Sequence, residues 1–177
     1  MNHHFATPIP WETRVKGPRY GSDDTYRMAA EWLSGCVQVA DWGGCLGYFQ
    51  NFLPKETHYT VVDGTSHEGW PPNWIVADLA KYSEPSQGIL LRHVLEMTPS
   101  WREVLDNALA AFTERMVVVT FTPDVPRTRL ATNHLTWPVH HFAHGLDLIP
   151  QMRPYLIRYE SITVKKTLPE RVYYLEK

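Results

Sequence analysis

The sequence is poor in the features that mark several common protein classes. Its 177 residues contain only two cysteines, Cys36 and Cys45, too few for a disulfide framework and without metal-ligand spacing around them. No apolar run reaches the length that spans a membrane, and residues 1–10 lack the apolar core of a signal peptide. We therefore expect a soluble protein that works in the cytoplasm.

An excess of positive charge is also missing. The formal net charge is −2, so composition gives no basic surface for nucleic acid or for an anionic membrane. No internal repeat, linker or low-complexity segment divides the chain, and we expect a single domain over residues 1–177. Residues 1–22 are rich in proline, glycine and charge and are expected to form a loop or a lid. Seven tryptophans suit either a dense core or aromatic walls around a ligand.

Hydrophobic periodicity predicts strands that alternate with helices. We expect a helix from Asp23 or Asp24 to Leu33, a short one at 46–53, one at 100–112 and a weak one at 144–152. Expected strands cover 37–40, 59–62, 73–77, 88–91 and 116–121, and a final strand pair covers 155–164 and 171–175; residues 122–139 look irregular.

This order predicts an α/β fold, a three-layer sandwich with a mostly parallel sheet. The closing strands have only a short link between them, which requires an antiparallel pair. The connections after the second and third strands are too short and too rich in proline for helices. We therefore expect the sheet to be partly uncovered at that side.

The most informative segment is the exit of the first strand. Residues 41–47 read Asp-Trp-Gly-Gly-Cys-Leu-Gly between a predicted strand and a predicted helix. A strand, a glycine loop and a helix in this order open a nucleotide-type site, because glycine lets the backbone turn tightly and approach a ligand. The dinucleotide fingerprint fails here, since its second and third glycines fall on Cys45 and Tyr48. A nicotinamide oxidoreductase is accordingly disfavoured.

The same loop resembles the S-adenosylmethionine loop of class I methyltransferases, acidic-x-Gly-x-Gly-x-Gly, with Cys45 in place of the middle glycine. A second resemblance lies in residues 88–97, where an apolar strand runs into His-Val-Leu-Glu and a helix follows, as in the small-molecule members. Together the two cover about residues 25–121. Five parallel strands and a terminal antiparallel pair are also that family's layout.

The resemblance implies S-adenosylmethionine as cofactor and S-adenosylhomocysteine as product. Three acids follow three successive strands, where an open α/β sheet forms its ligand crevice. Asp63 would accept the ribose hydroxyls, and Asp78 the adenine amine, with Leu79 beside it as a backbone donor and apolar wall. Arg92 is a candidate for binding an acidic group of the ligand. The loop would hold the methionine end through Asp41, Gly43, Gly44, Cys45 and Gly47. The alternative is that aspartate merely favours turns after strands.

For an oxygen acceptor, His93 is the candidate general base, since histidine titrates near neutral pH. The alternative is a histidine that only packs or orients backbone. Four further residues are candidates for an acceptor wall, or else surface side chains: Tyr20, Trp137, His140 and His144. No third ligand accompanies the last two, so no metal site is expected.

We therefore expect methyl transfer to a small-molecule or sugar-like acceptor. Sequence motifs of DNA-methylating enzymes are absent after the fourth strand, so no nucleic-acid substrate is expected. The alternative is a non-catalytic module of the same fold that binds the cofactor or a partner, which the substituted Cys45 and the shortened connections favour. The oligomeric state is left open by the sequence.

Overall fold

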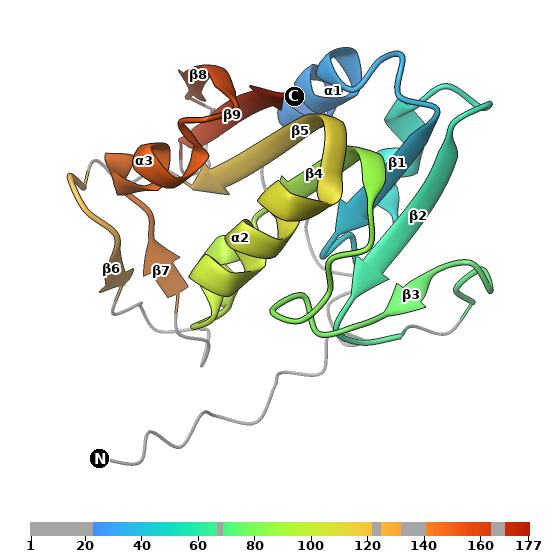
Figure 1. Ribbon diagram of the computed structural model, residues 1–177, viewed down its shortest axis with the longest axis horizontal. Coiled ribbons are helices and arrows are strands. Elements are labelled where there is room, and N and C mark those ends of the chain that lie inside the picture. The colour runs from blue at the N-terminus through green and yellow to red at the C-terminus, as the bar shows by residue number, and fades with distance from the viewer. Residues whose placement is uncertain (1–22, 67–68, 122–124, 132–140, 164–168) are drawn as a thin grey trace.

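A seven-stranded sheet forms the centre of the molecule (Figure 1). The computed structural model describes residues 23–66, 69–121, 125–131, 141–163 and 169–177. In spatial order the strands are β3 (Ile75–Val76), β2 (His58–Asp63), β1 (Gln38–Trp42), β4 (Ser86–Arg92), β5 (Phe112–Phe121), β9 (Glu170–Glu176) and β8 (Leu156–Ile162). The first five are parallel to one another, and β9 is antiparallel to both β5 and β8. The predicted mostly parallel sheet with a terminal antiparallel pair is confirmed.

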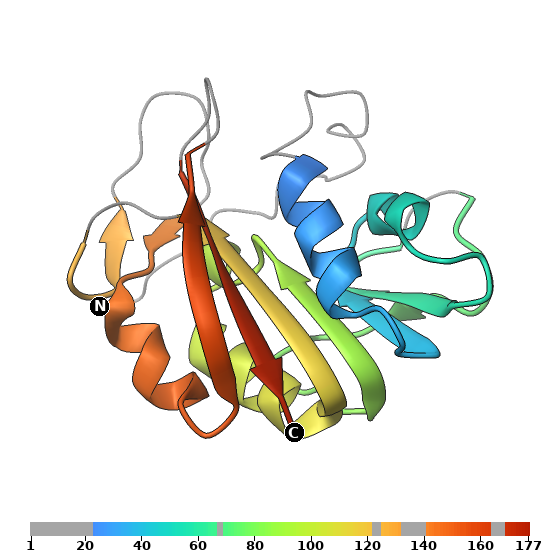
Figure 2. The same ribbon diagram turned by 90° about the horizontal axis from the view of Figure 1, so that it is seen from above.

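Helices α1 (Asp23–Trp32) and α2 (Trp101–Ala111) cover opposite faces of this sheet (Figure 2). Because successive strand residues point to opposite faces, β4 contributes to two separate cores. Ile89 and Leu91 pack in one core with Leu105 of α2, whereas Leu90 packs in the other with Ala29 of α1. All five side chains are fully buried, and the sheet is therefore the middle layer of a three-layer sandwich.

The order of the strands reverses beside β1. This strand pairs with β2 on one side and with β4 on the other. The chain therefore builds the sheet outward from β1 to β2 and β3, and then crosses to the other side of β1 to form β4. In open α/β sheets the crevice at such a switch point, outside the carboxyl ends of the strands, is the usual ligand site. The glycine loop directly follows β1 and so lies at this point.

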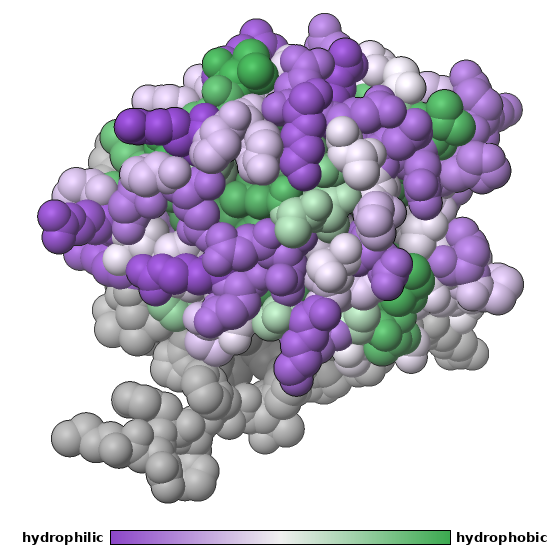
Figure 3. All heavy atoms as spheres, viewed as in Figure 1, coloured by the Kyte–Doolittle hydropathy of each residue, from purple (hydrophilic) through white to green (hydrophobic). Residues whose placement is uncertain are grey.

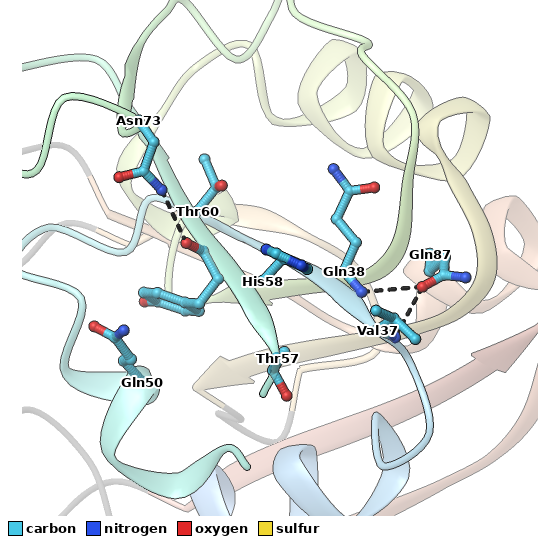
Figure 4. Close-up of a pocket in the computed structure, with 9 residues that line it drawn as sticks. Val37, Gln38, Gln50, Thr57, His58, Thr60, Asn73 and Gln87 are labelled. Carbon is cyan, nitrogen blue, oxygen red and sulfur yellow. Dashed lines mark hydrogen bonds between the residues drawn. The ribbon is translucent and has the colours of Figure 1, made fainter. Parts of the chain in front are cut away.

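The side of the sheet near β2 and β3 is thinly covered, as the short connections predict. Within the described residues, no helix connects β2 to β3 or β3 to β4. A shallow polar groove opens there instead, at the amino ends of β1, β2 and β4 (Figure 4). Gln87 closes its rim by accepting hydrogen bonds from the backbone N–H groups of Val37 (2.8 Å) and Gln38 (3.0 Å). The groove lies at the opposite ends of the strands from the glycine loop and contains none of the site residues that the sequence predicts.

Several predicted boundaries were wrong. Strand β1 runs through Asp41 to Trp42 instead of ending before the acid, because both side chains are buried in the sheet. The short helix after the glycine loop is a 3-10 segment, η2 (Tyr48–Phe52). Part of the stretch predicted as irregular forms β6 (Arg129–Ala131), which pairs with β7 (His141–Ala143) in a small second sheet.

Three short helical segments complete the described fold. They are η3 (Leu95–Met97), η4 (Leu146–Leu148) and α3 (Ile149–Met152), the last two within the predicted weak helix. None of the helices in the described residues is long and apolar enough to cross a membrane. Figure 3 shows polar residues over most of the visible face, with hydrophobic residues gathered in separate patches.

Candidate functional site

The glycine loop has a backbone that side chains would obstruct. Gly43 and Gly47 have φ angles of 77° and 68°, in the left-handed region that glycine adopts without strain. A Cβ atom on Gly43 would collide with Val94, and one on Gly47 would collide with the indole of Trp74. The loop is closed by a hydrogen bond from Gly47 N–H to the Gly44 carbonyl, at 2.8 Å. These glycines are therefore required by the fold of the loop.

Cys45 lies in the left-handed backbone region that favours glycine. Its φ is 51°, which costs a residue with a side chain about 1–2 kcal/mol. The loop therefore carries local strain at this residue. Burial raises the pKa of the Cys45 thiol to about 11, and the neighbouring Asp63 carboxylate acts in the same direction. The thiol is consequently protonated near neutral pH and is a poor nucleophile.

Asp41 is a buried carboxyl group directly beneath the loop. Its exposed fraction is 4%, and the Tyr59 hydroxyl donates a hydrogen bond to Oδ2 at 2.6 Å. Burial raises the pKa of Asp41 to about 7, although Tyr59 and the positive charge of Arg92 act against this. A Cβ atom on Gly44 would lie 2.6 Å from Oδ2, so this glycine gives the carboxyl group its space. Tyr59 was not among the predicted site residues, because in the sequence it looks like an ordinary core residue of β2.

Asp63 connects the end of β2 to the glycine loop. Its Oδ2 accepts a hydrogen bond from Cys45 N–H at 3.0 Å, and its Oδ1 accepts a longer one from Thr65 N–H at 3.4 Å. Asp63 therefore fixes the loop at the end of β2. Asp41 and Asp63 are also close enough for the charge of Asp63 to raise the pKa of Asp41.

Asp78 and Leu79 follow β3 and are less tightly held. The Asp78 side chain is 57% exposed, forms an ion pair with Lys81 at 3.3 Å and accepts a hydrogen bond from Ala80 N–H. Leu79 is partly buried against the core on the α2 side. Ala77 N–H donates to the Asp63 carbonyl at 2.9 Å, which brings this exit beside that of β2. The three acids thus share one edge of the sheet.

Arg92 and His93, at the exit of β4, belong to a buried charged cluster. Glu170, at the start of β9, accepts hydrogen bonds from Arg92 Nη2 at 3.1 Å and pairs with His93 Nε2 at 2.6 Å. Arg92 also donates to Thr25 and Tyr26 of α1. The side chains of Arg92, His93 and Glu170 are only 6%, 9% and 0% exposed. The cluster therefore joins α1, β4 and β9 in the interior.

The second carboxylate of this cluster is Glu96 in η3. Its Oε1 lies 3.4 Å from His93 Nδ1 and accepts a hydrogen bond from Phe121 N–H. Burial opposes ionisation of both glutamates, but hydrogen bonding and charge from His93 hold the pKa of Glu96 and of Glu170 below the ordinary value. Both ring nitrogens of His93 thus face carboxylates, and the ring also stacks on Phe121 at 3.8 Å.

Of the four acceptor-wall candidates, only His144 lies in the described residues; Tyr20, Trp137 and His140 lie outside them. His144 is fully buried, and its ring packs against Trp101 at 5.0 Å and Phe142 at 6.2 Å. Its Nδ1 lies 3.2 Å from the Thr128 hydroxyl, and burial lowers its pKa. An acceptor would have to reach it past these rings, and its role remains a prediction. Among the described residues, no group of three or more His, Cys, Asp or Glu side chains is arranged to hold a metal ion.

No protein-family profile matches this chain, and no curated protein matches it in sequence. Solved structures do match in fold. The 1,6-didemethyltoxoflavin-N1-methyltransferase of Burkholderia thailandensis superposes with a TM-score of 0.71 at 17% identity, over 87% of this chain and 76% of that one. The N-methyltransferase NodS of Bradyrhizobium japonicum gives 0.65 at 15% identity, over 97% and 93%.

The magnesium protoporphyrin IX methyltransferase of Synechocystis gives a TM-score of 0.62 at 14% identity, over 87% of this chain and 78% of that one. The first two proteins were crystallised with S-adenosylhomocysteine and the third with S-adenosylmethionine. Sequence identities this low support a common fold but do not identify the substrate. Strand order, the glycine loop at the switch point and these superpositions agree: the chain has the class I methyltransferase fold.

Proposed function

We propose that the protein binds S-adenosylmethionine and transfers its methyl group to a small-molecule or sugar-like acceptor. The observation that carries this proposal is the unit formed by Asp41, the glycine loop and Asp63 at the switch point of the sheet. It places a glycine-rich backbone between two carboxyl groups, which suits a ligand that has an ammonium group and a ribose. The structural neighbours bind the same cofactor or its product.

In this proposal each of the three carboxyl groups binds a different part of the cofactor. Asp41 and the backbone of Gly43, Gly44, Cys45 and Gly47 would hold the methionine end. Asp63, at the end of β2, would accept the ribose hydroxyls. The exposed Asp78 would accept the adenine amine, with Leu79 beside it, and Arg92 would act from beneath through its charge on Asp41. The cofactor supplies an activated methyl group, so the protein has to position the acceptor and exclude water.

For an oxygen acceptor we propose His93 as the general base and Glu170 as the group that orients its ring. The 2.6 Å contact fixes Nε2, whereas the 3.4 Å separation of Nδ1 from Glu96 is long for a hydrogen bond. An acceptor hydroxyl would have to displace Glu96 from Nδ1. The competing explanation is a purely structural ion cluster, in which case replacing His93 lowers stability and leaves the rate per folded molecule unchanged.

Calorimetry with S-adenosylmethionine, S-adenosylhomocysteine and NAD tests the cofactor assignment. Both adenosyl ligands should bind, and at a hundredfold excess over the dissociation constant each should stabilise the fold by about 2.7 kcal/mol. Binding of NAD alone would refute the proposal. Transfer of a labelled methyl group to a compound in a metabolite extract, lost in Asp63→Ala, would then establish turnover. We also propose a cytoplasmic location, which imaging of the tagged full chain would test.

A second candidate function is a cofactor-binding or partner-binding module without turnover. The strained Cys45 in the loop favours it, because the side chain adds bulk where the family pattern has none. Tight binding of S-adenosylhomocysteine with no methyl transfer to any extract component would support the module. Appearance of transfer in Cys45→Gly would show that the cysteine alone blocks catalysis.

A further inference from the structure

The edge strand β8 is far less buried than its neighbour β9. Five successive residues, 157–161, are exposed, whereas six of the seven residues of β9 are buried. The exposed residues include Ile157 and Tyr159, whose exposed fractions are 57% and 45%. Within the described part of the chain, β8 pairs with β9 alone. Its outer edge therefore presents backbone N–H and C=O groups to a further strand.

The sequence of β8 is complementary to itself in the antiparallel direction. It reads Leu-Ile-Arg-Tyr-Glu-Ser-Ile, with Tyr159 at its centre. Pairing with a second copy about a two-fold axis at Tyr159 would place each Arg158 opposite Glu160 of the other copy. The pairing of β8 with β9 is irregular between Leu156 and Arg158, so this register applies to the residues around Tyr159 and not to Leu156. Opposite charges at facing positions stabilise strand pairs, whereas like charges there destabilise them.

The charged pair is already ordered on one face of β8. The guanidinium of Arg158 lies over the ring of Tyr174 at 4.5 Å, and Glu160 accepts a hydrogen bond from the Tyr174 hydroxyl at 2.8 Å. On the other face, the ring of Tyr159 packs beside that of Tyr173 at 5.8 Å. Because these contacts already restrict the side chains, association of two strands would cost less side-chain entropy.

We propose that two copies of this chain form a homodimer by antiparallel pairing of their β8 strands, which would continue the sheet from one copy into the next. A second copy fits this edge better than an unrelated partner, because the charges that it requires are those of β8 itself. Such an isologous contact is closed by its two-fold axis and does not lead to fibres. Strand β8 lies at the opposite end of the sheet from β2 and β3 (Figures 1 and 2).

Charge reversal tests the proposal in solution. By light scattering or analytical ultracentrifugation, the mass of the full chain should rise with concentration from 20.5 kDa toward twice that value. Arg158→Glu alone and Glu160→Arg alone should each be monomeric, since like charges would face each other. An equimolar mixture of the two variants should dimerise, because each reversed charge then meets its opposite. Lys55→Glu, an exposed site between η2 and β2, is the matched control for net charge and should dimerise like the wild type.

Disulfide trapping tests the register. Facing residues of an antiparallel pair have Cα atoms about 4.5–5.5 Å apart, within reach of a disulfide. Tyr159→Cys, on the axis, should therefore cross-link into a covalent dimer under mild oxidation. In Ile157→Cys the two new thiols would be four positions out of register, about 13 Å along the strands. That variant should remain uncross-linked.

Three results would overturn the proposal. One is a wild type that stays monomeric at about 1 mM, which is the dissociation constant of a very weak complex. The second is a dimer that both charge-reversed variants retain, which would place the interface elsewhere. The third is a mixture of folded variants that fails to associate, which would refute this register. None of these results bears on cofactor binding, so the proposed function is tested separately.

Discussion

Replacing Asp41 by asparagine should make the protein more stable at neutral and alkaline pH. The carboxyl group is 4% exposed, and burial raises its pKa from 3.8 to about 7. Because the folded state holds this proton more tightly than the unfolded chain does, the stability contribution of Asp41 is complete below pH 3.8 and is lost as the pH rises through 7. Asparagine keeps the shape and an acceptor for Tyr59 but does not titrate.

The size of the effect follows from the two pKa values. Each tenfold change in proton affinity corresponds to about 1.4 kcal/mol, so full ionisation of Asp41 costs the fold about 4 kcal/mol. Between about pH 4.5 and about pH 8, the unfolding free energy of Asp41→Asn should therefore gain about 3 kcal/mol relative to that of the wild type. The quantity to compare is how much the difference in unfolding free energy changes between the two pH values. Any effect of the amide group that does not depend on pH cancels in this comparison.

Urea unfolding at several pH values, followed by far-UV circular dichroism, measures this difference. Asp24→Asn is a matched control, because Asp24 is exposed and its ion pair with Arg27 is a surface contact worth at most about 1 kcal/mol. Its difference from the wild type should depend little on pH. If the Asp41→Asn difference is equally flat, the carboxyl group is not desolvated and the geometry beneath the glycine loop is wrong.

Three further changes test the site. Asp63→Ala should weaken cofactor binding by roughly 2–4 kcal/mol in calorimetry while leaving the fold intact, and unchanged affinity would make the acid a turn residue only. Gly44→Ala should also weaken binding, because its Cβ would lie 2.6 Å from Asp41 Oδ2; normal affinity in this variant would contradict the close approach. With an oxygen acceptor, His93→Ala should reduce turnover about 10²–10⁴-fold, and full turnover would mean that the base is another residue.

Sequence patterns predicted the part of the candidate site whose residues lie close together along the chain. The strand exit at Asp41 and the glycines after it lie within a few residues of one another, so spacing alone identified the loop. The second acid, Asp63, followed from the parallel sheet, because parallel strands end at one edge. Cys45 stands at the middle glycine position of the loop pattern, and its φ of 51° lies in the left-handed region. Propensity disfavours this conformation, but the hydrogen bond from Cys45 N–H to Asp63 holds it.

Contacts between residues that lie far apart in the sequence could not be predicted from such patterns. Glu170 lies 77 residues from His93, and no periodicity links the two. Their contact exists because β9 pairs antiparallel with β5, which places the start of β9 at the same end of the sheet as the exit of β4, with β5 between them. The hydrogen bond from Tyr59 to Asp41 likewise needs the register of β1 against β2. Charged side chains of this kind look like surface residues until the sheet is assembled.

Strand β3 has a consequence for how a ligand would meet this site. It pairs with β2 through only two residues, and its outer side forms an edge of the sheet. Segments with so few contacts open locally at little free-energy cost, and their amides exchange quickly with solvent. Asp78 and Leu79 directly follow this strand, so the adenine end of the proposed site would be the part that opens most often. Hydrogen exchange at residues 75–79 should then slow markedly when ligand binds, whereas amides in β1 and β4 should already be protected without it.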